Sequence, residues 1–80
     1  MNKRIGAAII IVEDNDKVES LNKVISNHSE MILGRQGIPM RQRGLSIISL
    51  VLEGTTDELG SLTGKIGRIS GIRIKSVLAT

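Results

Sequence analysis

Three arginines stand close together in a glycine-rich stretch, and their side chains are well suited to binding a ligand. Arg35, Arg41 and Arg43 lie within residues 34–44, which read GRQGIPMRQRG. Guanidinium groups and free backbone N–H groups bind phosphate and carboxylate oxygens, the guanidinium often through two parallel hydrogen bonds. The stretch therefore predicts a site for a small anion. The predicted ligand-binding residues are Arg35, Gln36, Gly37, Arg41 and Arg43, with Gly54, Thr55 and Thr56 at a helix start whose backbone N–H groups offer a second anion contact.

The same arginines have a second explanation that needs no ligand. Pro39 and the neighbouring glycines weaken regular strand pairing, so this stretch belongs at the edge of a sheet. Charged side chains on an edge strand keep it from pairing with other chains. Both interpretations, an anion site and a guarded edge, stay open at this point.

Side chains typical of an active site or a metal site are scarce in the sequence. His28 is the single histidine and there is no cysteine, which removes the usual catalytic dyads and thiolate metal sites. The position of His28 at the end of an expected helix favours a solvated, structural residue. Glu13, Asp14 and Asp16 lack the spacing of a calcium-binding loop and are better explained as helix caps. We expect no catalytic residues, no cofactor and no metal site.

Composition narrows the range of partners. The formal net charge is +3, which ordinary protein surfaces reach without binding nucleic acid. The sequence has no Phe, Tyr or Trp, so it lacks stacking platforms for single-stranded nucleic acid. The apolar run from Ala7 to Val12 is far too short to span a bilayer. We expect a cytoplasmic protein that neither binds DNA directly nor enters a membrane.

The elements that must position these residues follow from hydrophobic periodicity. Residues 4–12 and 45–52 are apolar on both alternating sets and predict two strands covered on both sides. Residues 30–40 and 72–77 predict two edge strands. One helix is expected to follow a cap at Asp16 and to end at residues 27–29, and a second to start from a Thr55–Glu58 capping box. Gly60, Gly64 and Gly67 in that second helix predict close packing on the sheet, or fraying of its last turn after Gly64.

This order of strands and helices predicts one α+β domain over residues 1–80, a ferredoxin-like βαββαβ plait. Its four-stranded antiparallel sheet would carry both helices on one face, with the first and third strands at the centre. Ile48, Leu50 and Leu52 should meet the helices, whereas Ile47, Ser49 and Val51 should lie on the uncovered face.

The uncovered face predicts self-association. Each large apolar side chain left in water forfeits about 1.5–3 kcal/mol of burial free energy, so we expect a second copy to cover that face. The predicted assembly is a homo-oligomer, a dimer or a tetramer. Its predicted interface residues are Ile47, Ser49 and Val51.

Three segments carry a resemblance to a known family: GRQGIP at 34–39, RGLSIIS at 43–49 and LTGKIGR at 62–68. With them the chain resembles the small proteins labelled iron-only hydrogenase system regulators. More distantly it is similar to ACT domains and to the C-terminal sensing domain of nickel-responsive regulators. The resemblance implies an ACT-like fold, dimers or tetramers assembled through the sheets, and a small effector bound between subunits.

Two properties of those distant relatives do not carry over. Their nickel site uses several histidines and a cysteine, and this sequence has His28 alone. Their DNA-binding module would precede a first strand that here starts at Arg4. We therefore predict a non-enzymatic regulatory module, serving in transcriptional or hydrogenase-system regulation, that binds a small anionic effector between subunits. The alternative is a purely structural protein–protein interaction domain with no ligand.

Overall fold

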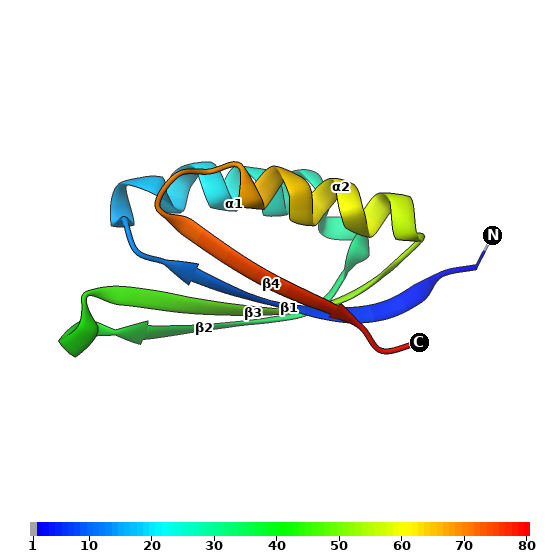
Figure 1. The fold of residues 1–80 in the computed structure, drawn as a ribbon, viewed down its shortest axis with the longest axis horizontal. Coiled ribbons are helices and arrows are strands. Elements are labelled where there is room, and N and C mark those ends of the chain that lie inside the picture. The colour runs from blue at the N-terminus through cyan, green and yellow to red at the C-terminus, as the bar shows by residue number, and fades with distance from the viewer. Residues whose placement is uncertain (1) are drawn as a thin grey trace.

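The structure, a computed structural model, describes residues 2–80. It has two layers, a twisted sheet and a pair of helices that lie across one face of it (Figure 1). The elements in chain order are β1 (Arg4–Val12), α1 (Val18–Asn27), β2 (Ile32–Met40), β3 (Leu45–Gly54), α2 (Thr56–Gly67) and β4 (Ile72–Leu78). Short 3₁₀ helices at Asn15–Lys17, Ser29–Met31 and Arg41–Arg43 join some of them.

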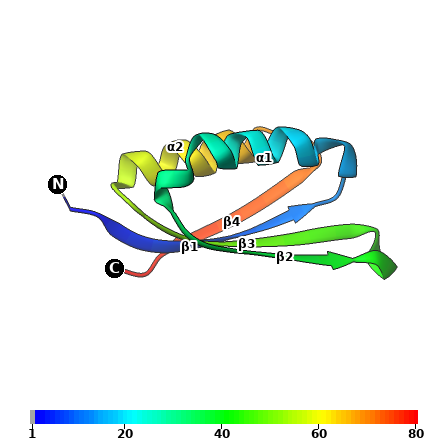
Figure 2. The same ribbon diagram turned by 180° about the vertical axis from the view of Figure 1, so that it is seen from behind.

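The sheet is antiparallel throughout and its strand order is β2-β3-β1-β4. β1 and β3 are central and the two strands broken by glycine or charge lie at the edges, which confirms the predicted ferredoxin-like topology. Both helices cover the same face, as the view from behind also shows (Figure 2). The other face has no covering element among residues 2–80.

The core lies between the sheet and the helices. Every second residue of the central strands points into it, and Ile48, Leu50 and Leu52 are buried there as predicted. The buried apolar residues are Ala8, Ile10, Val12, Leu21, Ile25, Met31, Ile48, Leu50, Leu52, Leu59, Leu62, Ile66 and Ile72. One face of each central strand therefore packs against the helices to form the monomer's core.

The helix caps agree with the prediction for α2 and differ for α1. The Thr55 hydroxyl accepts a hydrogen bond from the Glu58 N–H at 3.2 Å, and the Glu58 carboxylate accepts one from the Thr55 N–H at 2.8 Å. This capping box was predicted. The cap predicted at Asp16 is wrong: Asp14 caps a 3₁₀ turn by accepting from the Asp16 N–H at 3.0 Å, and α1 begins only at Val18.

The glycines of α2 do not have the role predicted for them. The helix continues through Gly67, so its last turn does not fray after Gly64. A Cβ placed on Gly60 or on Gly64 would have no neighbour within 4 Å, and one on Gly67 would make an ordinary 3.6 Å contact with Ile74. Close packing of α2 on the sheet therefore does not require glycine at these positions.

Candidate functional site

The turn between β2 and β3 projects beyond the helices at one end of the sheet (Figure 1). Its 3₁₀ helix presents Arg41 and Arg43 to solvent and ends at Gly44, whose positive φ of 66° a residue with a side chain rarely adopts. A hollow of about 530 Å³ lies against this turn, lined by Ile38, Pro39, Met40, Arg41, Gln42 and Arg43. Two of the three predicted arginines thus border one hollow that also has apolar walls.

Arg35 is held elsewhere. It lies opposite Leu50 in the sheet, and residues directly opposite each other share a face, so its side chain is on the helix side. There its guanidinium donates a 2.7 Å hydrogen bond to the Asn22 side-chain oxygen on α1. Arg35 ties β2 to the first helix, whereas Arg41 and Arg43 make no such bond in the described chain.

A β-bulge decides which side each β2 residue takes. Ile32 pairs with Leu52 but Gly34 pairs with Val51, so Leu33 is an extra residue on β2. After the bulge Gln36 lies opposite Ser49 on the uncovered face, while Gly37 lies opposite Ile48 on the helix side. The predicted residues 35–37 are therefore divided between the two faces.

The second predicted anion contact, Gly54-Thr55-Thr56, lies at the opposite end of the sheet from the β2–β3 turn (Figures 1 and 2). The capping box already engages the Thr55 N–H and the Glu58 N–H. Hydrogen bonds from the backbone N–H and the hydroxyl of Thr55 lower the pKa of Glu58 below its ordinary value of 4.5, so this helix start carries a carboxylate at neutral pH. Within one chain the predicted ligand residues therefore occupy separate places.

The uncovered face presents an apolar surface built mainly by β1 and β3. Ile9 and Val51 are 47% and 46% exposed there, and Ile47 is half-buried beside Ile11. Ser49 lies in the middle of the same face, opposite Ile9. The predicted interface residues Ile47, Ser49 and Val51 do share this face, although their role in assembly stays a prediction.

Two cations on this face were not among the predicted site residues. Arg73 lies opposite Ile11 and Lys75 opposite Ile9, so both belong to the β4 margin of the uncovered face. Arg73 also lies 3.9 Å from the exposed Glu13 carboxylate, a weak surface pair. The alternation along residues 72–77 predicted that one side of β4 is polar. Only the strand pairing shows that this polar side lies on the same face of the sheet as Ile9 and Ile11 of β1.

His28 is half-buried and hydrogen-bonded rather than solvated. Its Nδ1 lies 2.8 Å from the Val24 carbonyl oxygen, and its Nε2 lies 3.4 Å from the Lys65 ammonium. A neutral ring with the proton on Nδ1 donates to the carbonyl and accepts from Lys65. The ring therefore links the end of α1 to α2.

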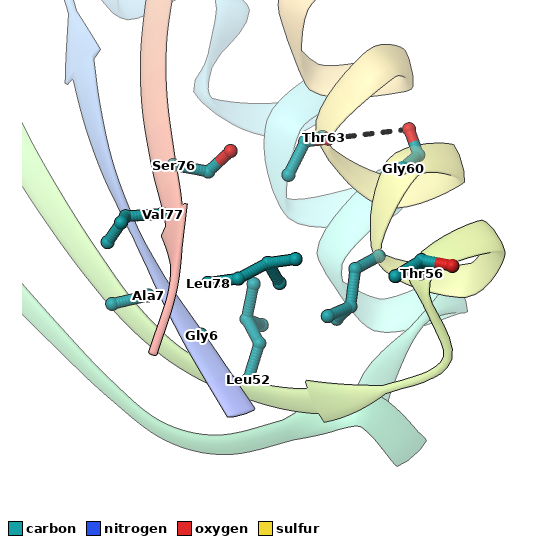
Figure 3. A pocket seen from close by; sticks show the side chains of 10 residues that line it. Gly6, Ala7, Leu52, Thr56, Gly60, Thr63, Ser76, Val77 and Leu78 are labelled. Carbon is teal, nitrogen blue, oxygen red and sulfur yellow. Dashed lines mark hydrogen bonds between the residues drawn. The ribbon is translucent and has the colours of Figure 1, made fainter. Parts of the chain in front are cut away.

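Other features of residues 2–80 bear on function as well. They contain no group of three or more His, Cys, Asp or Glu side chains placed to hold a metal ion. None of the helices in this part of the chain has the length and apolar character needed to cross a membrane. A further hollow, which sequence reasoning missed, lies between α2 and β4 (Figure 3).

Comparison with known proteins identifies the family. Residues 4–76 match the family model described as "TM1266-like: Iron-only hydrogenase system regulator, putative". The chain belongs to this family. It is also similar to the solved structure of the uncharacterized protein TM1266 from Thermotoga maritima, with 42% identity and a TM-score of 0.93, over 99% of this chain and 100% of that one. The family name assigns a regulator, and no curated protein matches the chain.

More distant structures share only the fold of this regulator family member. The divalent ion tolerance protein CutA1 from Ehrlichia chaffeensis is 12% identical, with a TM-score of 0.57 over 100% of this chain and 85% of that one. The nitrogen regulatory PII-like protein CPII from Thiomonas intermedia K12 is 8% identical, with a TM-score of 0.52 over 98% and 95%. Both likenesses support the ferredoxin-like architecture and nothing finer.

Proposed function

We propose that this chain is a non-enzymatic regulatory module that assembles with further copies through its uncovered sheet face and binds a small anionic effector between subunits. The family name supports the regulatory role. The observation that carries the assembly is the apolar surface on the side of the sheet without helices. A cytoplasmic setting, in which such a module would act on the hydrogenase system or on transcription through another chain, belongs to the same proposal.

The uncovered face has the composition of an interface centre. Rows of side chains run across it: Ile38, Ile47 and Ile11 form one row, and Val51, Ala7 and Val77 form another. Among these, Ile38, Val51 and Val77 are exposed, Val77 to 66%. Covering each large side chain recovers about 1.5–3 kcal/mol, a large amount beside a total domain stability of about 5–15 kcal/mol. A second copy presenting the same face is the simplest cover.

The effector is assigned to the β2–β3 turn because that hollow adjoins the uncovered face. Ile38 belongs to both: it lies opposite Ile47 on the face and also lines the hollow beside Arg41 and Arg43. A copy seated on the face would therefore meet the hollow at its margin. Two exposed guanidinium groups beside apolar walls suit an anion that also has an apolar part.

The assembly is tested by sedimentation at micromolar concentration. The wild-type chain should show at least twice the 8.6 kDa monomer mass. Val51→Lys should return the mass to that of a monomer, because it places a charge within the apolar surface. Ser61→Lys adds the same charge on the exposed side of α2 and should leave the assembly intact. A monomeric wild-type protein would refute the proposal.

The effector is tested by thermal shift with a panel of amino acids, nucleotides and divalent metals, since a molecule that binds only the folded state raises the melting temperature. For an anion that does so, Arg41→Lys and Arg43→Lys should each weaken binding by about 1.5–3 kcal/mol, because lysine lacks the bidentate fork. Arg35→Lys is the matched control and should leave affinity unchanged, since Asn22 engages Arg35.

A structural interaction domain without a ligand predicts a different outcome. No member of the panel would raise the melting temperature, and Arg41→Gln or Arg43→Gln, which remove the charge that the lysine variants keep, would increase aggregation through the exposed edge. Affinity and solubility measured together on these proteins distinguish the two functions.

A further inference from the structure

A hollow of about 210 Å³ lies between α2 and the C-terminal end of β4, on the helix side of the sheet. Figure 3 shows it from close by, with side chains of the sheet and of α2 on its two sides. It is lined by the apolar side chains of Leu52, Leu59 and Leu78, the glycines Gly6 and Gly60, and the hydroxyl residues Thr56, Thr63 and Ser76; Ala7 and Val77, whose side chains lie on the uncovered face, also border it. It shares no lining residue with the hollow at the β2–β3 turn.

The hollow exists because small residues meet there from both layers. Gly6 lies opposite Leu52 and Leu78, so a side chain is missing from the middle of that row on the helix side. Gly6 is itself required, since a Cβ there would lie 2.6 Å from the Val77 carbonyl oxygen. The next row pairs Ala8 with Ser76, again two small residues.

The other end of the same two elements is filled. Ile10 lies opposite Ile74 on β4 and is fully buried, and Ile66 of α2 is fully buried too. α2 and β4 are therefore packed by branched side chains at one end and separated by an open hollow at the other. The difference follows from the residues present, because the backbone elements are continuous along both ends.

Gly60 keeps the α2 side of the hollow open. An interior helical glycine is less favourable than alanine, and the space around Gly60 would accept a Cβ without any contact inside 4 Å. Folding of the single chain therefore gives no reason for glycine at this position. Glycine at this position leaves the space beside α2 free for a bound molecule.

The lining defines the chemistry of that molecule. Among residues 2–80 no ionisable side chain lines the hollow. The Thr63 hydroxyl donates to the Gly60 carbonyl at 3.3 Å and keeps its acceptor lone pairs, and Ser76 extends from β4 toward α2 (Figure 3). The α2 start next to it already carries the carboxylates of Asp57 and Glu58, which disfavour an anion. Apolar walls with a few hydroxyls suit a neutral molecule.

We propose that this hollow is a binding site for a small neutral ligand with an apolar body and one or two hydrogen-bonding groups. Its volume lies between the cavity of about 150 Å³ that holds benzene and the usual ligand pockets of about 300–1,000 Å³. The ligand is thus somewhat larger than one six-membered ring. The site is separate from the anion site of the proposed function, and either can fail without the other.

Cyclohexanol is the probe for this site, followed by amide chemical shifts in a nitrogen-15 NMR titration. Saturable shifts are expected at Gly60, Thr63, Ser76 and Leu78, with a dissociation constant of about 1 mM. Cyclohexanecarboxylate, equal in ring size but charged, should bind at least about tenfold more weakly, because the site offers no partner for its charge.

Two variants of α2 form a matched pair. Gly60→Leu fills the hollow and should abolish the cyclohexanol shifts, while Gly64→Leu makes the same change at a helix position that does not line it and should retain them. Both changes raise helix propensity, so a thermal melt should show that both proteins are folded.

Three results would overturn the proposal. The first is an absence of saturable shifts in the wild-type protein. The second is cyclohexanol binding that survives Gly60→Leu. The third is a shift of the Gly60 and Thr63 amides, which lie on α2 away from the uncovered face, with protein concentration when no probe is present, because this would show that another copy of the chain fills the hollow.

Discussion

The two faces of the sheet use neighbouring residues of the same strands in opposite ways. On β3, Leu50 is 1% exposed beneath the helices while Val51, the next residue, is 46% exposed on the other side. β1 repeats this with Ile10 and Ile9. A domain that needed only its own helices could place polar residues on the second face, as antiparallel sheets commonly do. The apolar second face shows that alternation along a strand does not by itself tell which of its two faces the single chain covers.

The sharpest test of that comparison is truncation of adjacent residues on β3. Leu50→Ala should lower the free energy of unfolding by about 2–5 kcal/mol, because it leaves a cavity in the core. That loss should not depend on protein concentration. Val51→Ala should cost less, and its cost should vanish on dilution to monomer, where exposed substitutions change stability by about 0.5 kcal/mol or less. If both variants lost the same free energy of unfolding at all protein concentrations, the predicted difference between the two faces would be wrong.

A milder change on β1 addresses the uncovered face alone. Ile9→Thr keeps a β-branched side chain, so the strand should persist, but it removes apolar area from the surface. We expect a loss of about 1–2 kcal/mol in assembly free energy per subunit, consistent with partial loss of a buried isoleucine. The measurement is the dependence of melting temperature on protein concentration, which should flatten. Ser61→Thr, on the exposed side of α2, is the control and should leave the concentration dependence of the melting temperature unchanged.

The covered face depends on α2 remaining helical, and replacing a glycine of α2 changes the stability of that helix. Gly64→Ala should raise the free energy of unfolding by about 0.5–1 kcal/mol, since the new methyl group meets nothing within 4 Å. Gly6→Ala is the contrasting change and should destabilise, because its Cβ would press on the Val77 carbonyl oxygen. Denaturant midpoints at an unchanged slope measure both effects.

The smallest expected effect is the pH dependence contributed by the cap of α2. The pKa of Glu58 is lower in the folded protein than in the unfolded chain, mainly because its carboxylate accepts the Thr55 backbone N–H. The cap therefore stabilises the folded protein above pH 4.5, and this stabilisation is lost as the pH falls through the lowered pKa of Glu58. Glu58→Gln should remove this part of the acid dependence while leaving the melting curve cooperative. If the stability of the wild-type protein and of Glu58→Gln depended on pH in the same way, the carboxylate charge of Glu58 would have no part in this stabilisation.

Most of the fold could be predicted because the signals for it are local. Strands with two apolar faces must be central, so residues 4–12 and 45–52 determined the strand order. The Thr55–Glu58 spacing alone identified the start of α2. The cap at Asp16 was wrong because three acceptors stand close together before α1, and a 3₁₀ turn selects Asp14.

The candidate sites were harder to predict because they depend on pairing between distant residues. The extra residue at Leu33 moves each following β2 side chain to the other face, and nothing in the local pattern marks that bulge. Arg35 therefore reaches Asn22 rather than the arginines of the turn. The hollow beside Gly60 arises only when Gly6 lies opposite Leu52 and Leu78, a register that spacing along the chain does not reveal.

The central position of β1 also has a consequence for the order in which the chain can fold. β1 pairs with β3 on one side and with β4 on the other, and Gly6 meets Leu78 near the far end of the sequence. Contacts of such long sequence separation give a high relative contact order, which slows folding. During synthesis at about 5–20 residues per second, the apolar β1 must wait several seconds for its last partner strand. Until then the edge of β1 that pairs with β4 is open to other strands.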